Sequence, residues 1–88
     1  MNTETYLNHP NFGLLYRICI VGENQELFTT LYAQRLYFFV SNQPSGWQFQ
    51  PVTRNEARIQ VENRLRMLRR NRQMTEAQEL MKIHQRHF

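Results

Sequence analysis

The sequence has no aspartate and only one cysteine, and both shortages limit the chemistry that it can support. Without aspartate there is no Ser-His-Asp triad, and catalysis by paired carboxylates would need two of only seven glutamates. The lone Cys19 excludes an internal disulfide and any zinc site built from several cysteines. Glycine-rich phosphate loops are also missing, because Gly13, Gly22 and Gly46 are isolated. We therefore expect a protein that is not an enzyme and that carries no cofactor.

Long apolar runs are missing as well. No stretch reaches the ~18 to 20 apolar residues that a membrane-spanning helix needs. The first residues, 1–4, lack the basic and apolar regions of a signal peptide. We expect a cytoplasmic protein with no membrane contact, in which Cys19 is an inert thiol in the core.

Charge is divided unevenly along the 88 residues: residues 1–53 have a net charge of −1 and residues 54–88 a net charge of +5. Ten of the eleven basic residues are arginines, whose planar guanidinium favours directed contacts with carboxylates and phosphates. The densest cluster comprises Arg64, Arg66, Arg69, Arg70 and Arg72. It is either a solvated helix face with ion pairs such as Glu62–Arg66, or a surface for phosphates or acidic proteins. Nucleic acid is the less favoured partner, because nearly all aromatic residues lie in the other half of the chain.

The first half of the chain is typical of β-strands. Aromatic and β-branched residues dominate residues 14–21, 26–31 and 36–40, and residues 47–50 alternate between aromatics and glutamines. Turn-forming residues separate these runs at 22–24 and 42–46. Four or five short antiparallel strands predict a small, strongly bent sheet or barrel of the Tudor or SH3-like kind over residues 1–53.

The second half predicts two amphipathic helices within residues 54–88. Thr53 and Glu56 have the spacing of a capping box, and an apolar stripe follows at Ala57, Val61, Leu65 and Leu68. Arg66, Arg69 and Arg70 fall mostly on the opposite side of this helix. After a break at residues 71–73, Thr75 and Gln78 repeat the capping pattern, and a second stripe comprises Ala77, Leu80, Met81 and His84.

The break between the helices is short, so we expect them to fold back as an antiparallel hairpin, which gives an α+β fold. Each stripe is too narrow for a helix that is stable alone, so the hairpin is expected to be the looser part of the molecule. His84 and His87 are three residues apart, which suits a metal, but no other ligands accompany them. We expect partly exposed helix-end histidines that complement the helix dipole, and no metal site.

Residues 32–36 (Tyr-Ala-Gln-Arg-Leu) lie between the second and third expected strands. They are either an ordinary connection whose tyrosine covers a small core, or a protein-binding hot spot. Tyrosine and arginine are both enriched in such hot spots.

Several segments resemble the PipX family, the PII-interacting proteins X of cyanobacteria: residues 6–10, 12–17 and 26–36. The similarity extends over nearly the whole chain, including residues 61–66, and the uninterrupted motif at residues 24–36 is highly specific. The resemblance implies a Tudor-like domain followed by two helices, and a non-enzymatic adaptor in nitrogen regulation.

The resemblance also implies two partners that exclude each other. One is the signalling protein PII, whose flexible T-loops are held against the small protein when 2-oxoglutarate is low and ADP supports the complex. The other is NtcA, a transcription factor of the CAP family, which is bound when 2-oxoglutarate is high. There the small protein stabilises the active conformation of NtcA and acts as a coactivator.

Carried over residue by residue, the resemblance implies one interface that both partners share. Its members are Tyr32, Gln34, Arg35 and Leu36, with Glu4, Tyr6, Arg17 and Phe38 as neighbours. A second, basic surface at Arg66, Arg69 and Arg70 is expected to meet other transcription machinery or nearby DNA phosphates, without sequence-specific binding of nucleic acid. The rival hypothesis, from charge alone, is a nucleic-acid-binding module.

Overall fold

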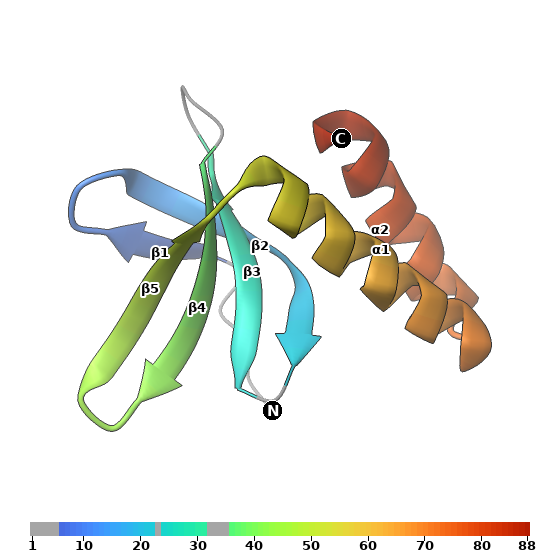
Figure 1. Ribbon diagram of the computed structural model, residues 1–88, viewed down its shortest axis with the longest axis horizontal. Coiled ribbons are helices and arrows are strands. Elements are labelled where there is room, and N and C mark those ends of the chain that lie inside the picture. The colour runs from blue at the N-terminus through green and yellow to red at the C-terminus, as the bar shows by residue number, and fades with distance from the viewer. Residues whose placement is uncertain (1–5, 23, 32–35) are drawn as a thin grey trace.

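The computed structural model describes residues 6–22, 24–31 and 36–88 and shows a curled sheet followed by two helices (Figure 1). The strands are β1 (Tyr6–His9), β2 (Gly13–Gly22), β3 (Gln25–Thr30), β4 (Tyr37–Gln43) and β5 (Gly46–Val52). They form one antiparallel sheet in the order β1-β2-β3-β4-β5. The helices are α1 (Arg54–Arg70) and α2 (Met74–His87), which lie side by side along one side of the sheet. The α+β class and the bent antiparallel sheet are therefore confirmed.

The strands differ from the sequence prediction in two places. Residues 6–9 form β1, which pairs with β2 so that Tyr6 lies opposite Tyr16. Strand β4 continues to Gln43, which pairs with Gly46. The expected turn at 42–46 is thus shortened to two central residues, Pro44 and Ser45. Gly46 adopts a φ of +120°, a conformation that L side chains rarely adopt.

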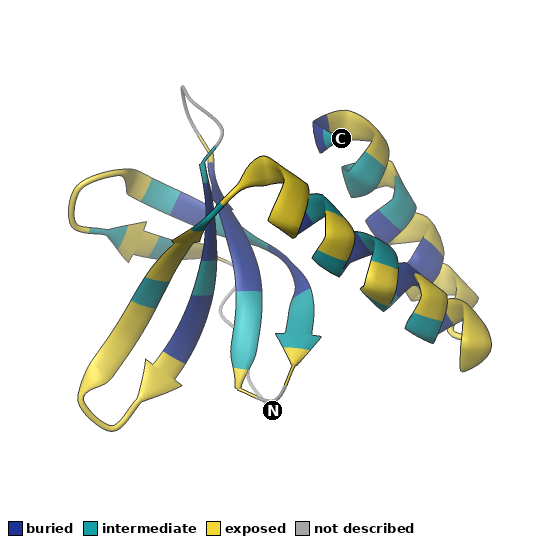
Figure 2. Ribbon diagram, viewed as in Figure 1, coloured by how far each residue is buried: buried dark blue, intermediate teal, exposed yellow. Residues whose placement is uncertain are grey.

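The sheet carries apolar side chains on both faces. Figure 2 shows that buried residues concentrate in β2, β3 and β4, whereas β5 is largely exposed. Inside the curl, one cluster consists of Leu15, Phe28, Phe38 and Val40. Alternation along β4 sends Tyr37 to the opposite face, where the helices pack. This explains why residues 36–40 are apolar at every position.

Helix α1 begins as the sequence predicts. The Thr53 hydroxyl accepts a hydrogen bond from the Glu56 amide (3.0 Å), and the Glu56 carboxylate accepts one from the Thr53 amide (2.9 Å). The predicted stripe of α1 is buried at all four positions, Ala57, Val61, Leu65 and Leu68. The capping box and the 3.6-residue period are local signals, so they do not depend on the rest of the fold.

The predicted cap of α2 at Thr75 is wrong. The helix begins at Met74, and its N-cap is Gln73, which makes no side-chain capping bond. The Gln73 amide donates to the Leu68 carbonyl (2.8 Å), which closes α1, and its own carbonyl accepts from Ala77 (3.0 Å). One residue therefore serves the end of α1 and the start of α2. Thr75 lies inside the first turn, where its backbone is already helical.

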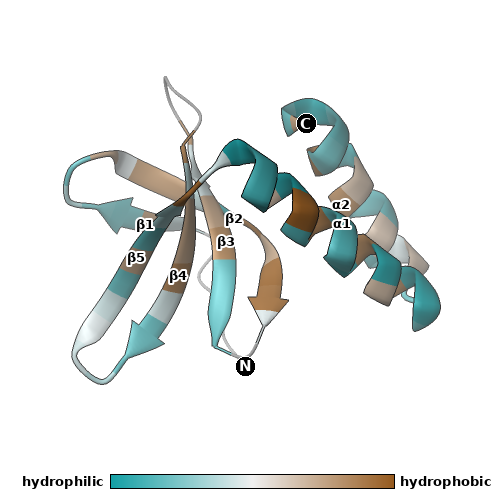
Figure 3. Cartoon of the chain, viewed as in Figure 1, coloured by the Kyte–Doolittle hydropathy of each residue, from teal (hydrophilic) through white to brown (hydrophobic). Residues whose placement is uncertain are grey.

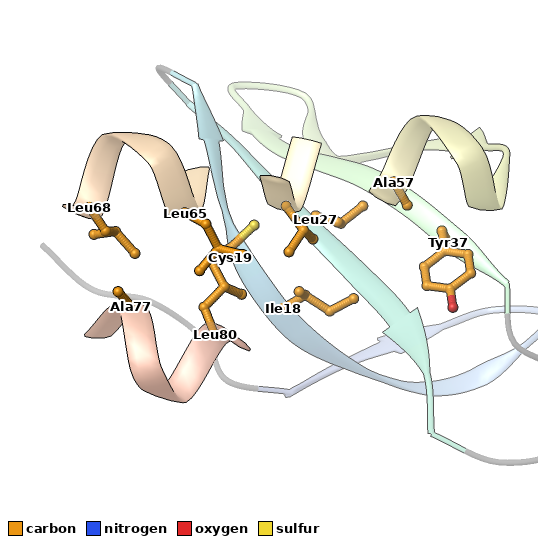
Figure 4. Close-up of a cluster of buried hydrophobic side chains, with 10 residues drawn as sticks. Ile18, Cys19, Leu27, Tyr37, Ala57, Leu65, Leu68, Ala77 and Leu80 are labelled. Carbon is orange, nitrogen blue, oxygen red and sulfur yellow. The ribbon is translucent and has the colours of Figure 1, made fainter. Parts of the chain in front are cut away.

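The hairpin of α1 and α2 packs on the sheet through the larger of the two hydrophobic clusters. Figure 4 shows Ile18, Cys19, Leu27 and Tyr37 of the strands meeting the buried residues of both helices, among them Ala57, Leu65, Leu68, Ala77 and Leu80. Strands and helices thus contribute to one continuous core. Neither α1 nor α2 is long and apolar enough to cross a membrane, and these are the helices of the described residues.

The C-terminal end of α2 is attached to the sheet by polar contacts as well. The Nε2 atom of His87 lies 2.5 Å from the Tyr16 hydroxyl, and His87 is only 6% exposed. Arg54, at the start of α1, donates to the His87 carbonyl (2.9 Å), and its guanidinium lies 5.5 Å from the centre of the Phe88 ring. The expectation that His87 is a partly exposed helix-end residue is therefore wrong, because the sheet covers its ring.

Candidate functional site

Four of the eight residues proposed for a partner interface lie outside the described part of the chain. These are Glu4, Tyr32, Gln34 and Arg35. What the structure does describe is the backbone on either side of residues 32–35. The candidate site is therefore built from its two stems, at Thr30–Leu31 on one side and Leu36 on the other.

Hydrogen bonds hold the two stems together. The Thr30 amide donates to the Leu36 carbonyl (3.1 Å), and the Leu36 amide donates to the Thr30 hydroxyl (3.1 Å). The Thr29 hydroxyl also donates to the Leu36 carbonyl (2.8 Å). Both threonines are buried, so the bonds are shielded from water. We call these three bonds the threonine clamp. The clamp fixes where the segment 32–35 leaves the sheet and where it returns.

The two leucines beside the clamp, Leu31 and Leu36, differ in exposure. Leu31 is 39% exposed, and its amide donates to the Leu14 carbonyl of β2 (3.0 Å). Leu36 is half buried against the cluster that contains Phe28 and Phe38. Leu31 therefore exposes apolar area beside residues 32–35, and hydrogen bonds and packing hold the backbone of the stems in place.

The other described candidates lie on different parts of the sheet. Tyr6 is 53% exposed on β1, opposite Tyr16, whereas Phe38 is only 2% exposed. Arg17 follows Tyr16 along β2, so its side chain lies on the other face of the sheet from Tyr6. The structure thus brings Leu36 and Phe38 together in one cluster and does not place Tyr6 beside Arg17. Phe38 is buried in the cluster against which Leu36 packs, so it supports Leu36 from within the core.

Arg17 forms an ion pair within the sheet. Its Nη1 atom lies 3.4 Å from the Glu26 carboxylate of β3, and both side chains are about a quarter exposed, at 27% and 22%. A partner that approaches Arg17 with a carboxylate would compete with Glu26 for it. This ion pair was not predicted from the sequence, because it depends on the register between β2 and β3.

An aromatic group beneath the sheet edge was also missed by sequence reasoning. The ring of His9 stacks on Phe38 (centroids 5.2 Å apart), lies tilted against Phe12 (4.9 Å) and makes an edge-type contact with Phe49 (4.8 Å). The His9 Nδ1 atom accepts hydrogen bonds from the amides of Asn11 (3.0 Å) and Phe12 (3.3 Å). Only the pairing of β1 with β2 shows that His9 helps to support Phe38.

The basic residues Arg66, Arg69 and Arg70 are all exposed on α1, along which hydrophilic and hydrophobic stretches alternate in Figure 3. The ion pair Glu62–Arg66 suggested by the i,i+4 spacing is wrong. Arg66 instead bonds the Asn63 side chain.

Glu62 is bonded elsewhere, to His84 of α2 (3.1 Å) and to Arg58 (3.3 Å). The hydrogen bond from His84 and, after it, the charge of Arg58 lower the pKa of Glu62 below 4.5. The contact between Glu62 and His84 ties the two helices together. It depends on how α1 and α2 pack, which no local pattern reveals.

Cys19 and the metal-ligating residue types form no reactive or metal centre among the described residues. Burial raises the pKa of the Cys19 thiol from 9.0 to about 12, so the nucleophilic thiolate is suppressed, as expected of a core cysteine. Within the described ranges, no group of three or more histidine, cysteine or glutamate side chains could hold a metal ion.

Comparison with protein-family models gives a match over nearly the whole chain. The family model for PipX, PII-interacting protein X, covers residues 3–88. The chain belongs to the PipX family. No curated protein matches it. For this member of the PipX family, the family description indicates a regulatory protein that interacts with PII, and the match includes both the sheet and the hairpin.

Proposed function

We propose that this protein is a non-enzymatic adaptor in nitrogen control that binds either PII or the transcription factor NtcA. PII is the partner when 2-oxoglutarate is low. When 2-oxoglutarate is high, NtcA is the partner and the protein is its coactivator. The exchange takes place in the cytoplasm. The observation that carries the proposal is the match to the PII-interacting family over residues 3–88.

In this proposal, one surface serves both partners. It comprises Tyr32, Gln34, Arg35 and Leu36, with contributions from Glu4, Tyr6 and Arg17, while Phe38 holds the surface from below. The threonine clamp supports it, because a binding segment whose two ends are fixed loses less conformational entropy when it binds. A single shared surface makes the two complexes mutually exclusive.

Truncation of two residues of the segment tests the surface. Tyr32→Ala and Arg35→Ala should each weaken both complexes by ~2 kcal/mol or more, which is the usual size of a hot-spot effect. Binding to PII is measured with ADP and without 2-oxoglutarate, and binding to NtcA with 2-oxoglutarate. Gln48→Ala, at an exposed position of β5, is the matched control and should bind both partners like the parent.

Competition tests exclusivity. Excess PII without 2-oxoglutarate should displace the protein from NtcA, and no assembly should contain both partners on one copy. A stable ternary complex, or normal affinity of both alanine variants, would refute the shared surface.

The exposed Arg66, Arg69 and Arg70 support a second, weaker role for α1 in contacts with other transcription machinery or with DNA phosphates. A salt titration of the protein with duplex DNA alone tests the nucleic-acid version. Phosphate contacts would make the affinity fall steeply with salt. Negligible binding at low salt would leave acidic proteins as the partners of this surface.

A further inference from the structure

A groove of about 370 Å³ lies between the end of β2 and α1. Its lining comes from Ile20, Val21 and Gly22 of β2 and from Gln60, Asn63, Arg64 and Met67 of α1. We call it the β2–α1 groove. It lies outside the surface proposed above for PII and NtcA.

The floor of the groove is apolar and only half covered. Ile20, Val21 and Met67 are each partly exposed, and Val21 packs against the core cluster shared by sheet and helices. Methionine adapts its shape to different neighbours, so it suits a surface that receives a side chain from a partner. The floor can therefore take one aliphatic or aromatic group.

Arg64 lies at the rim of the groove and differs from two other half-buried arginines. Arg17 and Arg58 each pair with a glutamate, at 3.4 and 3.3 Å. Arg64 instead donates to the thioether sulfur of Met67 (3.8 Å), which is a weak acceptor. Among the described residues, no carboxylate lies within ion-pair distance of it. A guanidinium held in this way matches the geometry of a carboxylate.

The described residues that line the groove carry one charge, that of Arg64. None of these seven residues is acidic. The side chain of Asn63, which lines the groove, bonds Arg66, and Arg70 follows Met67 by three residues on the same helix. Glu76 and Glu79 line a smaller cavity, of about 170 Å³, to which Arg64 also contributes, but they form no ion pair with it among the described residues. The groove therefore favours an acidic ligand.

We propose that the β2–α1 groove binds a short acidic segment of a partner protein. The segment inserts one aliphatic or aromatic side chain between Ile20, Val21 and Met67 and places a carboxylate on Arg64.

The groove and the threonine clamp lie at opposite ends of β3. Gly22 pairs with Gln25 at the first end of β3, and Thr30 is its last residue, so about 17–20 Å of strand separates them. An acidic segment in the groove is thus compatible with a second protein at residues 32–36. This would make the small protein a bridge between two partners.

The test uses short synthetic peptides and the whole, isotope-labelled protein. The first peptide has one leucine and one phenylalanine among glutamates; the second replaces every glutamate with lysine, and the third replaces both apolar residues with serine. The first peptide should shift the methyl signals of Ile20, Val21 and Met67 and the side-chain signal of Arg64. The other two should leave these signals unchanged at the same concentration.

Matched charge variants identify the residue responsible. Arg64→Gln should weaken binding of the first peptide about tenfold or more, because a hydrogen bond to a charged group is lost. Arg69→Gln removes the same charge from an exposed position that does not line the groove, and it should change the affinity less than twofold at about 0.15 M salt. Met67→Gln provides a second test of the floor. An unchanged pattern of amide signals shows that each variant is folded.

Four results would overturn the proposal: equal binding of the lysine peptide, shifts centred on other residues, equal losses in the Arg64 and Arg69 variants, or no shifts at millimolar peptide. If the same methyl signals instead moved with protein concentration in the absence of peptide, the occupant would be a second copy of the chain.

Discussion

Replacing Thr30 with valine tests whether the threonine clamp holds the stems of the candidate site. Valine has nearly the shape of threonine and removes only the hydroxyl, so packing against the buried surroundings is retained. The hydroxyl accepts the hydrogen bond of the Leu36 amide (3.1 Å), and no other described residue provides an acceptor for that amide. Thr29→Val is the matched control within the same clamp. It removes a donor to the Leu36 carbonyl, which keeps its bond from the Thr30 amide.

The two variants should differ in size of effect. Leaving a fully buried amide without a partner costs about 1–3 kcal/mol, and the half-buried Leu36 amide should fall toward the lower end of that range, whereas losing one of two donors to a carbonyl costs about 0.5–1.5 kcal/mol. We therefore expect Thr30→Val to lower the free energy of unfolding more than Thr29→Val. In a domain of this size, each kcal/mol also corresponds to a fall of about 4–8 °C in Tm.

Urea unfolding followed by fluorescence measures both variants, with the slopes of the transitions compared to confirm that the same surface unfolds. Binding to PII provides the functional readout. If the clamp positions residues 32–35, Thr30→Val should weaken PII binding under conditions where the variant remains folded. Wild-type stability of Thr30→Val, or a larger loss in Thr29→Val, would refute the reasoning.

Three further predictions concern the core and the helices. Because the pKa of Cys19 is raised to about 12, its thiol should react with iodoacetamide far more slowly in the native protein than in urea, and the stability that its burial contributes should decline as the pH rises above 9.0. The hydrogen bond from His84, and after it a neighbouring arginine charge, lower the pKa of Glu62, so ionised Glu62 stabilises the fold above pH 4.5 and this contribution is lost as the pH falls through the lower folded value. Glu62→Gln should therefore reduce stability at about pH 7 and have a progressively smaller effect as the pH falls below 4.5, as measured by urea unfolding across this range. Tyr16→Phe removes the hydroxyl bonded to His87, so amide exchange should accelerate in the last turn of α2 and stay unchanged in β4 and β5.

The helices were predictable from sequence wherever the signal is local. The buried stripe of α1 follows from a period of 3.6 residues, and its start follows from a capping box that two side chains complete by themselves. His87 shows the limit of this approach. It lies one turn beyond the predicted stripe of α2, and its burial depends on Tyr16 and Tyr37 of the sheet being opposite it. No pattern within the helix contains that information.

In the sheet, too, local signals predicted some elements, and others depend on how the strands pair. Strong apolar runs predicted β2, β3 and β4, whereas β1 is a short edge strand of four residues in which exposed and partly buried positions alternate. Its partner is decided by register, and so is the position of His9 beneath Phe38. For the candidate site, composition indicated only that Tyr32, Arg35 and Leu36 could form a protein-binding surface. The other interface residues were implied by the resemblance to the PipX family. The threonine clamp could not be predicted, because it forms only when β3 and β4 are aligned in one particular register.

The start of β4 connects the candidate site with the helical hairpin. Leu36 is held by the threonine clamp, and the next residue, Tyr37, packs on the opposite face, with its ring 5.4 Å from that of Phe88. The residue after that, Phe38, returns to the first face. Three consecutive residues therefore link the clamp, the C-terminal end of the chain and the inner cluster of the curl. Lifting the hairpin from the sheet would expose the Tyr37 ring beside the fixed stem, at the cost of its buried apolar area. The hairpin thus helps to hold the stem that presents residues 32–35, even though no described residue of α1 or α2 forms part of that stem.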